Sequence, residues 1–261
     1  MSEPHPTLET RAEMYNSRIV ALRTTLGRAG IELEARGIDH AIATPECATA
    51  DHAGGLCVRC ELGDTRRLDG ATLEAITSAF DRYPTDALAS ANIERVALCS
   101  HIDHDSPDTA GTADLEGRRM MISLEPFAGR PYYDTLGEFT VEDIVHHEYF
   151  HLLESATMRD AIAGDPSWEH HNPDGFAYGK PRQDMARPAG FVDLYATSDA
   201  AEDRASVFQY LMARPDELCE LMHNDAVIRE KTRVIWQRIT AVTGDGFLRA
   251  RAGCVDPRWR L

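Results

Sequence analysis

One segment constrains the fold of this chain more than any other, the stretch VEDIVHHEYFHLL at residues 141–153. Its composition is that of a buried helix, yet it carries three histidines and three carboxylates. Thr140 can cap this helix, with Asp143 at the capping-box position. Buried polar groups without partners are costly, so the histidines and carboxylates of this helix require partners.

Two of the histidines have the spacing of a metal site. His147 and His151 stand four residues apart, which places both imidazoles on one face of a helix and allows them to bind one zinc ion. Glu148 between them can take a proton from a water molecule whose pKa zinc lowers to about 7. The alternative is a chance H-E-x-x-H with hydrogen-bonded histidines, which the apolar flanks disfavour. His146 lies off this face and is given no metal role.

A catalytic zinc site with an open position for water needs a third protein ligand. Glu202 lies in the first turn of a helix that we expect to begin near Ser198 as its N-cap, and it flanks the apolar stripe of that helix. A carboxylate at this position can reach inward. Glu202 is therefore the candidate for the third ligand.

These motifs carry a resemblance. H-E-Y-F-H at 147–151, followed by Y-x6-E at 195–202, resembles the gluzincin metallopeptidases, and in particular the catalytic domain group of anthrax lethal factor. The resemblance implies that His147, His151 and Glu202 bind zinc, that Glu148 is the general base and that Tyr195 assists at the oxyanion. It covers about residues 70–240 in architecture and 144–153 and 191–212 in recognisable motif.

The sequence departs from this family at one position. In the relatives, a carboxylate four residues after the ligand glutamate supports the site, whereas this chain has Ser206 there. Partners of this kind normally orient the ligand imidazoles. Asp203, Glu154 or a backbone carbonyl can substitute, and the sequence does not distinguish these three alternatives.

The remaining elements predict an α+β protein, a zincin-like metallopeptidase fold that is helix-rich with a small sheet. Periodicity predicts helices at 8–36, with a break expected at Gly27 and Gly30, at 70–82, from 198 to about 214, and at 216–240. It predicts strands at 93–99 and 119–125 with a loop between them. We expect an N-terminal helical and cysteine-containing segment at 1–69 and a catalytic domain at 70–261. The long connection 164–190 contains His170 and His171, which are candidates for the substrate pocket.

The cysteines leave several possibilities open. Cys47, His52, Cys57 and Cys60 have the spacing C-x4-H-x4-C-x2-C, which suits a structural zinc ion. The alternatives are a disulfide among these cysteines or buried thiols. The other cysteines, Cys99, Cys219 and Cys254, have apolar neighbours and are interpreted as small hydrophobic residues.

Charge and hydropathy exclude some functions. The formal net charge is -16, from 43 acidic and 27 basic residues, which disfavours binding to nucleic acid. The sequence contains neither a transmembrane run nor a secretory signal, so we expect no membrane association and a cytoplasmic location with mostly reduced or metal-bound cysteines. The oligomeric state is left open.

The sequence therefore predicts a zinc-dependent metallohydrolase, with Zn²⁺ as cofactor and a peptide as substrate. A first alternative is hydrolysis of a small amide or a modified amino acid. A second is a catalytically idle zinc-binding regulatory module, which Glu148 disfavours because a structural site has no need of a base.

Overall fold

The structure is a computed structural model that describes residues 8–35, 59–62, 70–103, 109–124, 127, 132–134, 137–158, 165–179, 186–244, 246–249 and 254. Its helices are α1 (Leu8–Gly27), α2 (Gly70–Asp81), α3 (Thr85–Ser90), α4 (Val141–Thr157), α5 (Pro166–Glu169), the 3-10 helix η4 (Tyr195–Thr197), α6 (Ala200–Ala213), α7 (Pro215–Asn224), α8 (Ala226–Thr243) and α9 (Gly246–Arg249). Its strands are β1 (Glu32–Glu34), β2 (Arg59–Leu62), β3 (Arg95–Asp103), β4 (Gly111–Asp114), β5 (Arg119–Ser123), β6 (Tyr132–Asp134) and β7 (Gly137–Phe139).

A small mixed sheet is built around β3, the longest strand described. The first half of β3 pairs in parallel with β1, and its second half pairs antiparallel with β2. On its other side β3 pairs in parallel with β5, and β4 pairs antiparallel with β5. The arrangement is helix-rich α+β, as the sequence predicted. The strand β4 was missed, because its residues GTAD have the composition of a loop.

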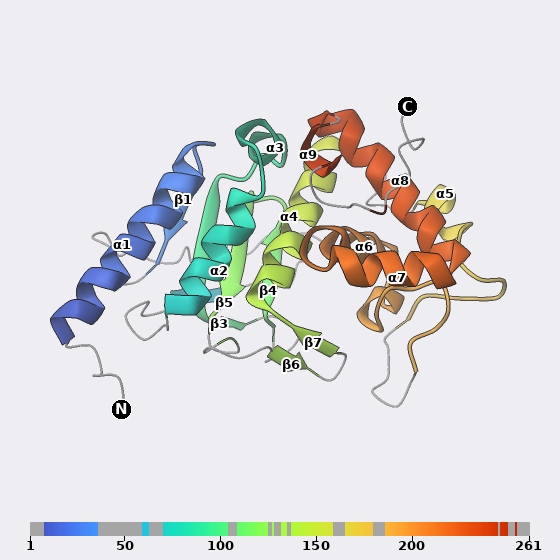
Figure 1. Cartoon of the computed structure of the whole chain (residues 1–261), viewed down its shortest axis with the longest axis horizontal. Helices are drawn as coiled ribbons and strands as arrows, with labels where there is room; N and C mark the ends of the chain where they lie inside the picture. The colour runs from blue at the N-terminus through green and yellow to red at the C-terminus, as the bar shows by residue number, and fades with distance from the viewer. Residues whose placement is uncertain are drawn as a thin grey trace, which may run out of the picture.

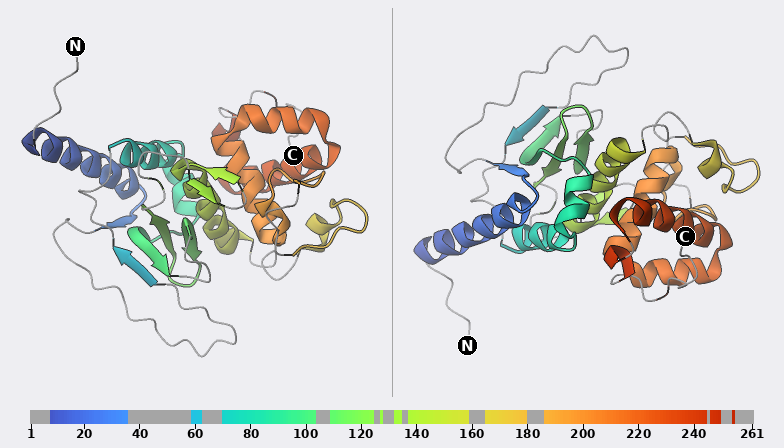
Figure 2. Two further views of the ribbon diagram at one scale, coloured as in Figure 1. Left: turned by 90° about the horizontal axis from the view of Figure 1, so that it is seen from below. Right: turned by 90° about the horizontal axis from the view of Figure 1, so that it is seen from above.

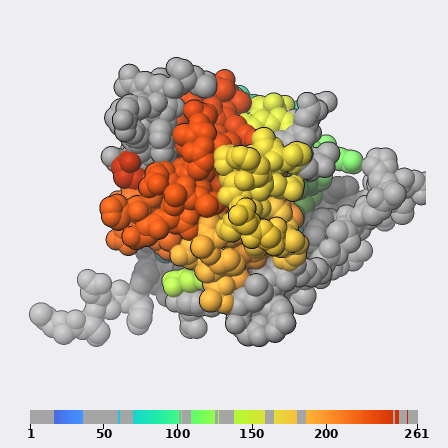
Figure 3. Space-filling model, turned by 90° about the vertical axis from the view of Figure 1, so that its right-hand side faces the viewer, coloured from blue at the N-terminus to red at the C-terminus, as the bar shows by residue number. Residues whose placement is uncertain are grey.

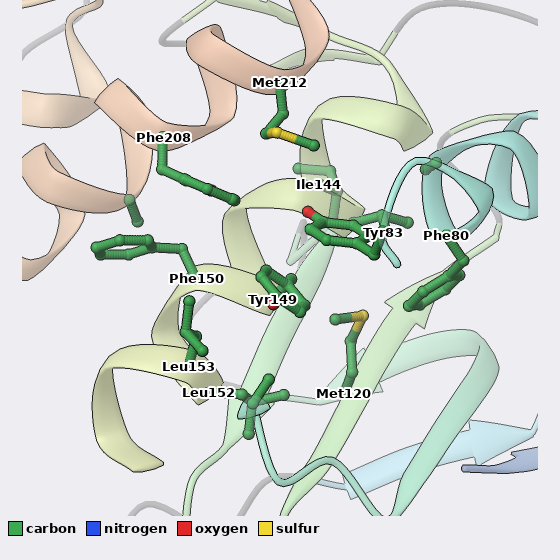
Figure 4. Close-up of a cluster of buried hydrophobic side chains, with 14 of the residues drawn as sticks. Phe80, Tyr83, Met120, Ile144, Tyr149, Phe150, Leu152, Leu153, Phe208 and Met212 are labelled. Carbon is green, nitrogen blue, oxygen red and sulfur yellow. The ribbon is translucent and has the colours of Figure 1, made fainter. Parts of the chain in front are cut away.

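The helix α4 lies between the sheet and α6 (Figure 1). It begins where the sequence predicted, since Thr140 and Asp143 form both hydrogen bonds of a capping box. Residues of α4, α6, β5 and the α2 region share one hydrophobic core (Figure 4). The labelled members are Phe80, Tyr83, Met120, Ile144, Tyr149, Phe150, Leu152, Leu153, Phe208 and Met212. The polar residues of α4 are therefore carried by a helix that is packed on two sides.

The helix expected over 8–36 ends at Gly27, one of the two glycines expected to break it, and residues 32–34 form strand β1 instead. Two further helix boundaries differ from the prediction. The N-cap of α6 is Asp199 and not Ser198, because the Asp199 side chain accepts hydrogen bonds from the backbone of Ala201 and Glu202. The helix expected at 216–240 is divided into α7 and α8 at Asp225. Asp225 adopts an extended conformation and caps α8 with its carboxylate, which ends one helix and begins the next.

Two disulfides correct the interpretation of the cysteines. Cys60 is bonded to Cys99, joining β2 to β3, and Cys219 is bonded to Cys254. Cys60 is therefore not free to bind a metal, and the prediction that Cys99, Cys219 and Cys254 are unlinked small hydrophobic residues is wrong. Because disulfides persist mainly in oxidising compartments, these bonds do not support the reducing environment that the sequence analysis expected.

Other residues of the expected cysteine site, Cys47, His52 and Cys57, lie outside the described part of the chain. The strands β1 and β2 precede residue 70 but belong to the same sheet as β3, and α1 packs against α2 at one end of the molecule (Figure 2). The division of the chain at residue 70 stays a prediction. Within the described residues, no helix has the length and apolar character required to cross a lipid bilayer.

Candidate metal centre

Three of the predicted site residues meet between α4 and α6. The Nε2 atom of His147 lies 2.8 Å from Oε2 of Glu202 and 3.1 Å from Nε2 of His151. The Nε2 atom of His151 lies 3.4 Å from the same Glu202 oxygen. Among the residues described, this histidine cluster, composed of His147, His151 and Glu202, is the only group of three or more His, Cys, Asp or Glu side chains placed to share a metal ion.

Charged clamps at both ends of α4 hold the two helices in this register. Near the start of α4, Asp143 accepts hydrogen bonds of 2.9 and 2.7 Å from the guanidinium of Arg214, which follows the last residue of α6. Near the end of α4, Glu154 accepts hydrogen bonds of 2.5 and 2.9 Å from Arg204 in the first turns of α6. Bidentate pairs of this kind fix geometry as well as adding energy, so the antiparallel helices cannot slide past each other without breaking them.

The electrostatics of the cluster favour positive charge. Burial alone would lower the pKa of His151, but Glu202 and Glu148 raise it to about 9. Burial alone would also lower the pKa of His147, but the hydrogen bond to Glu202 and the charges of Glu202 and Glu148 together raise it. Conversely, burial alone would raise the pKa of Glu202, and the two imidazoles hold it well below its usual range. A divalent cation satisfies the same demand for positive charge that raises these histidine pKa values.

The donor set fits zinc. Two imidazole nitrogens and one carboxylate oxygen are the ligands of one of the common catalytic zinc sites. A tetrahedral ion about 2.0–2.1 Å from each ligand atom places those atoms about 3.3 Å apart. The three separations in the histidine cluster, 2.8, 3.1 and 3.4 Å, are close to this value. The residues present therefore suit the ion that the sequence predicted.

The candidate base, Glu148, is 6% exposed and lies between α4 and the edge strand β4. Burial raises the pKa of its carboxyl group, and His147, His151 and a hydrogen bond from the backbone of Ala113 partly oppose this shift. A Cβ atom at Gly111 would lie 2.3 Å from Cγ2 of Ile144 and 3.1 Å from Oε1 of Glu148, so β4 can approach α4 this closely only with glycine at that position. Sequence reasoning missed Gly111 because it missed the strand.

The candidate oxyanion residue, Tyr195, lies at the start of η4. Its ring centroid is 5.7 Å from that of His147. The turn that carries it is fixed by Asp193, whose Oδ1 accepts a 2.7 Å hydrogen bond from the backbone of Ala196. Burial raises the pKa of Asp193 to about 6, although the Ala196 amide and His147 oppose the shift. Tyr195 is thus beside the histidine cluster, and its role in catalysis stays a prediction.

The two carboxylates proposed to replace the missing one, Glu154 and Asp203, form their hydrogen bonds with other residues. Glu154 is bound to Arg204, Asp203 is bound to Lys231, and Ser206 Oγ has no hydrogen-bond partner among the described residues. The partner of His147 is instead Gln209, whose Oε1 lies 3.1 Å from Nδ1 of His147. The sequence held a signal for this residue, because Gln209 follows Glu202 by seven positions and so lies on the same helix face.

The other histidines lie outside the cluster. His146 is fully buried, with Nδ1 2.5 Å from the hydroxyl of Tyr83. His170 and His171 follow α5, and their ring centroids are 4.6 Å apart. The segment that contains them lies beside α7 and α8 on the surface of the molecule (Figure 3). Their assignment to a substrate pocket stays a prediction.

Comparison with known proteins finds a similar fold but no similar sequence family. No protein-family model matches the sequence. No curated protein matches it either. The structure is similar to that of a candidate zinc-binding metallo-peptidase from Bacteroides caccae ATCC 43185, with a TM-score of 0.53 and 16% sequence identity over 95% of this chain and 93% of that chain. At this identity the likeness shows that the two proteins share a fold. The narrower resemblance to the lethal factor group stays a prediction.

Proposed function

We propose that His147, His151 and Glu202 hold a zinc ion and that the protein is a zinc-dependent hydrolase of amide bonds in peptides. The observation that carries the proposal is the convergence of three ligand atoms from two clamped helices, all within 4.8 Å of one another, next to the buried carboxylate of Glu148. The choice of peptides as substrates is supported by the fold, which is shared with a candidate zinc-binding metallo-peptidase.

The chemistry follows from these positions. Zinc at such a site supplies a Lewis acid that polarises a carbonyl oxygen and lowers the pKa of water to about 7. Glu148 accepts the proton of the attacking water and passes it to the leaving amine, as a general base and then a general acid. Tyr195 donates a hydrogen bond to the oxyanion that develops on the scissile carbonyl. The backbone of Ala113 donates a hydrogen bond that holds the carboxylate of Glu148 against β4.

The test compares zinc-loaded wild-type protein with the Glu148→Gln variant on a peptide library, with cleavage read by mass spectrometry. We expect the wild-type protein to cleave peptides and the variant to lose activity by a factor of about 10²–10⁴, because glutamine cannot accept the proton. Zinc content stays the same in both, because Glu148 is not a ligand. Glu169→Gln, at an exposed carboxylate of α5, is the matched control and keeps full activity.

The same assay includes small N-acyl amino acids and simple amides. If the protein hydrolyses these small compounds and no peptides, its substrate is a small amide, and the proposed roles of zinc, Glu148 and Tyr195 are unchanged. If zinc-loaded protein hydrolyses neither class, or if Glu148→Gln is as active as the wild type, the proposed function is wrong.

A further inference from the structure

A chain of buried hydrogen bonds leads from His147 away from the histidine cluster. Nδ1 of His147 lies 3.1 Å from Oε1 of Gln209, and Nε2 of Gln209 donates to Oδ1 of Asp143 at 3.3 Å. Asp143 in turn is held by the guanidinium of Arg214. His147, Gln209 and Asp143 are 4%, 1% and 1% exposed, so solvent does not compete for these bonds. The chain connects a cluster histidine to one of the two clamps between α4 and α6.

The direction of every bond in this chain is determined at its far end. The Asp143 carboxylate accepts hydrogen bonds from the guanidinium of Arg214 and from the backbone N–H of Thr140, so it acts as the acceptor in this network. The amide nitrogen of Gln209 must therefore face Asp143, which leaves the amide oxygen facing His147. An oxygen can only accept from the imidazole, so Nδ1 of His147 carries the proton. This assignment rests on the hydrogen-bond network, in which no other orientation satisfies all three groups.

The consequence appears at the other side of the ring. When a cation takes the place of the Nε2 proton that faces Glu202, the imidazole of His147 keeps its proton on Nδ1 and presents the lone pair of Nε2 towards Glu202 and His151. Only this tautomer can bind a cation between the three side chains. The ring is also held in orientation, because the Gln209 side chain is anchored at both of its polar atoms.

We propose that Gln209, anchored by Asp143 and Arg214, is a positioning residue that fixes the tautomer and orientation of His147 and so sets the affinity of the site for a divalent cation. The inference rests on the proposed function of the cluster as a metal centre. It assigns to a neutral amide the task that a carboxylate performs at position 206 in the resembling family. Gln209 acts through His147 and does not touch the cation or the substrate.

The rival explanation is that Gln209 only packs between α4 and α6. Two substitutions separate the explanations. Gln209→Met keeps the length of the side chain and its packing but removes the acceptor for Nδ1. Gln209→Glu keeps an acceptor for Nδ1 but places a second carboxylate against Asp143, which destabilises the helix pair. If Gln209 positions His147, Gln209→Met is the more stable variant but has the lower affinity for zinc. If Gln209 only packs, the more stable variant also has the higher affinity for zinc.

The experiment strips the full-length protein with a chelator and measures the affinity for zinc alone by competition with a chromophoric chelator. We expect Gln209→Met to bind zinc about 10–100-fold more weakly than the wild type. We expect Gln209→Glu to melt at a lower temperature than Gln209→Met and yet to bind zinc more tightly than it. Gln237→Met, at a glutamine of α8 that contacts Arg233, is the control and keeps wild-type affinity.

A spectroscopic measurement accompanies the affinities. In ¹H–¹⁵N correlation spectra of the zinc-loaded protein, the Nδ1 proton of His147 appears in the wild type as a slowly exchanging, hydrogen-bonded signal. In Gln209→Met this signal moves upfield and exchanges faster. Wild-type affinity with an unchanged signal in Gln209→Met overturns the inference, as does affinity that follows melting temperature across the two variants. If the wild-type protein binds no zinc, the proposed function itself fails. Equal zinc binding by the wild type and Gln209→Met instead overturns only the role of Gln209.

Discussion

Two adjacent residues of α6, Glu202 and Asp203, each place a carboxylate in a separate buried polar cluster. The two clusters differ in how the negative charge of the carboxylate is balanced. Glu202 points into the histidine cluster, where its contacts are imidazoles. Asp203 belongs to what we call the lysine network, composed of Asp203, Lys231, Trp168, Tyr178 and Phe191. There Oδ2 of Asp203 accepts hydrogen bonds of 2.7 Å from Lys231, 2.7 Å from Tyr178 and 2.9 Å from Trp168. The protein thus balances the Asp203 carboxylate with the ammonium group of Lys231, whereas the Glu202 carboxylate faces only titratable imidazole rings.

The lysine network has the features of a structural connection. Nζ of Lys231 is fully buried, donates to the carbonyl of Gly190 at 2.9 Å and lies 3.8 Å from the ring centroid of Phe191. These contacts join α6, α8 and the connection that precedes η4. In the histidine cluster the three ligand atoms face one another, an arrangement that is stable only with shared positive charge. The comparison teaches that a buried cluster of ionisable residues does not by itself indicate a metal site. The informative feature is whether a side chain of the protein supplies the positive charge that balances the buried carboxylate.

The largest effect that would sharpen this comparison is loss of the metal. Replacing His147 and His151 together with alanine removes two of the three ligands, and we expect zinc content to fall from about one per chain to nearly none. Elemental analysis of purified protein measures this directly. His170→Ala together with His171→Ala is the matched control, because these two neighbouring histidines lie outside the cluster. Unchanged zinc content in the cluster variant would mean that the metal binds elsewhere.

The second effect concerns the lysine network. Lys231→Met keeps the aliphatic volume but leaves Asp203 as an uncompensated buried charge, which we expect to lower the free energy of unfolding by about 3–5 kcal/mol. Denaturant titration measures the loss. In the fraction that remains folded, zinc content stays near one per chain, because Lys231 does not contact the histidine cluster. If the variant is as stable as the wild type but loses zinc, the two regions are not separate in the way described.

The smallest effects are expected for two tyrosine variants, one beside the histidine cluster and one in the lysine network. Tyr195→Phe keeps the ring beside His147 and removes its hydroxyl, and we expect kcat to fall by roughly 10²–10³ with zinc content unchanged. Tyr178→Phe removes a hydrogen bond to Asp203, and we expect it to cost about 1.5–3 kcal/mol of stability with kcat unchanged. Kinetic and thermal measurements on both variants test the pair. Wild-type kcat in a folded, zinc-loaded Tyr195→Phe would remove Tyr195 from the mechanism.

The sequence predicted the parts of the molecule that local patterns control. The beginning of α4, the buried strand β5 and the pairing of His147 with His151 all follow from capping chemistry and periodicity, which act over a few residues. Glu202 was placed at the cluster because its helix turn and the adjacent apolar stripe were recognisable. These predictions needed no knowledge of how distant segments meet.

What the sequence did not reveal depends on contacts between distant segments. The clamps between Glu154 and Arg204 and between Asp143 and Arg214 join residues 50 and 71 positions apart, and no local pattern distinguishes them from surface charges. The disulfide from Cys60 to Cys99 depends on the pairing of β2 with β3. The same holds for β4, whose short polar strand is defined by its neighbour β5 rather than by its own residues.

The central claim is that the histidine cluster, unlike the lysine network, is balanced by a metal ion. Crystals of the zinc-loaded protein, measured on both sides of the zinc absorption edge, test it most directly. We predict one anomalous peak about 2.0–2.1 Å from Nε2 of His147, Nε2 of His151 and a carboxylate oxygen of Glu202. Protein that is saturated with zinc and shows no peak between these three side chains would contradict the claim.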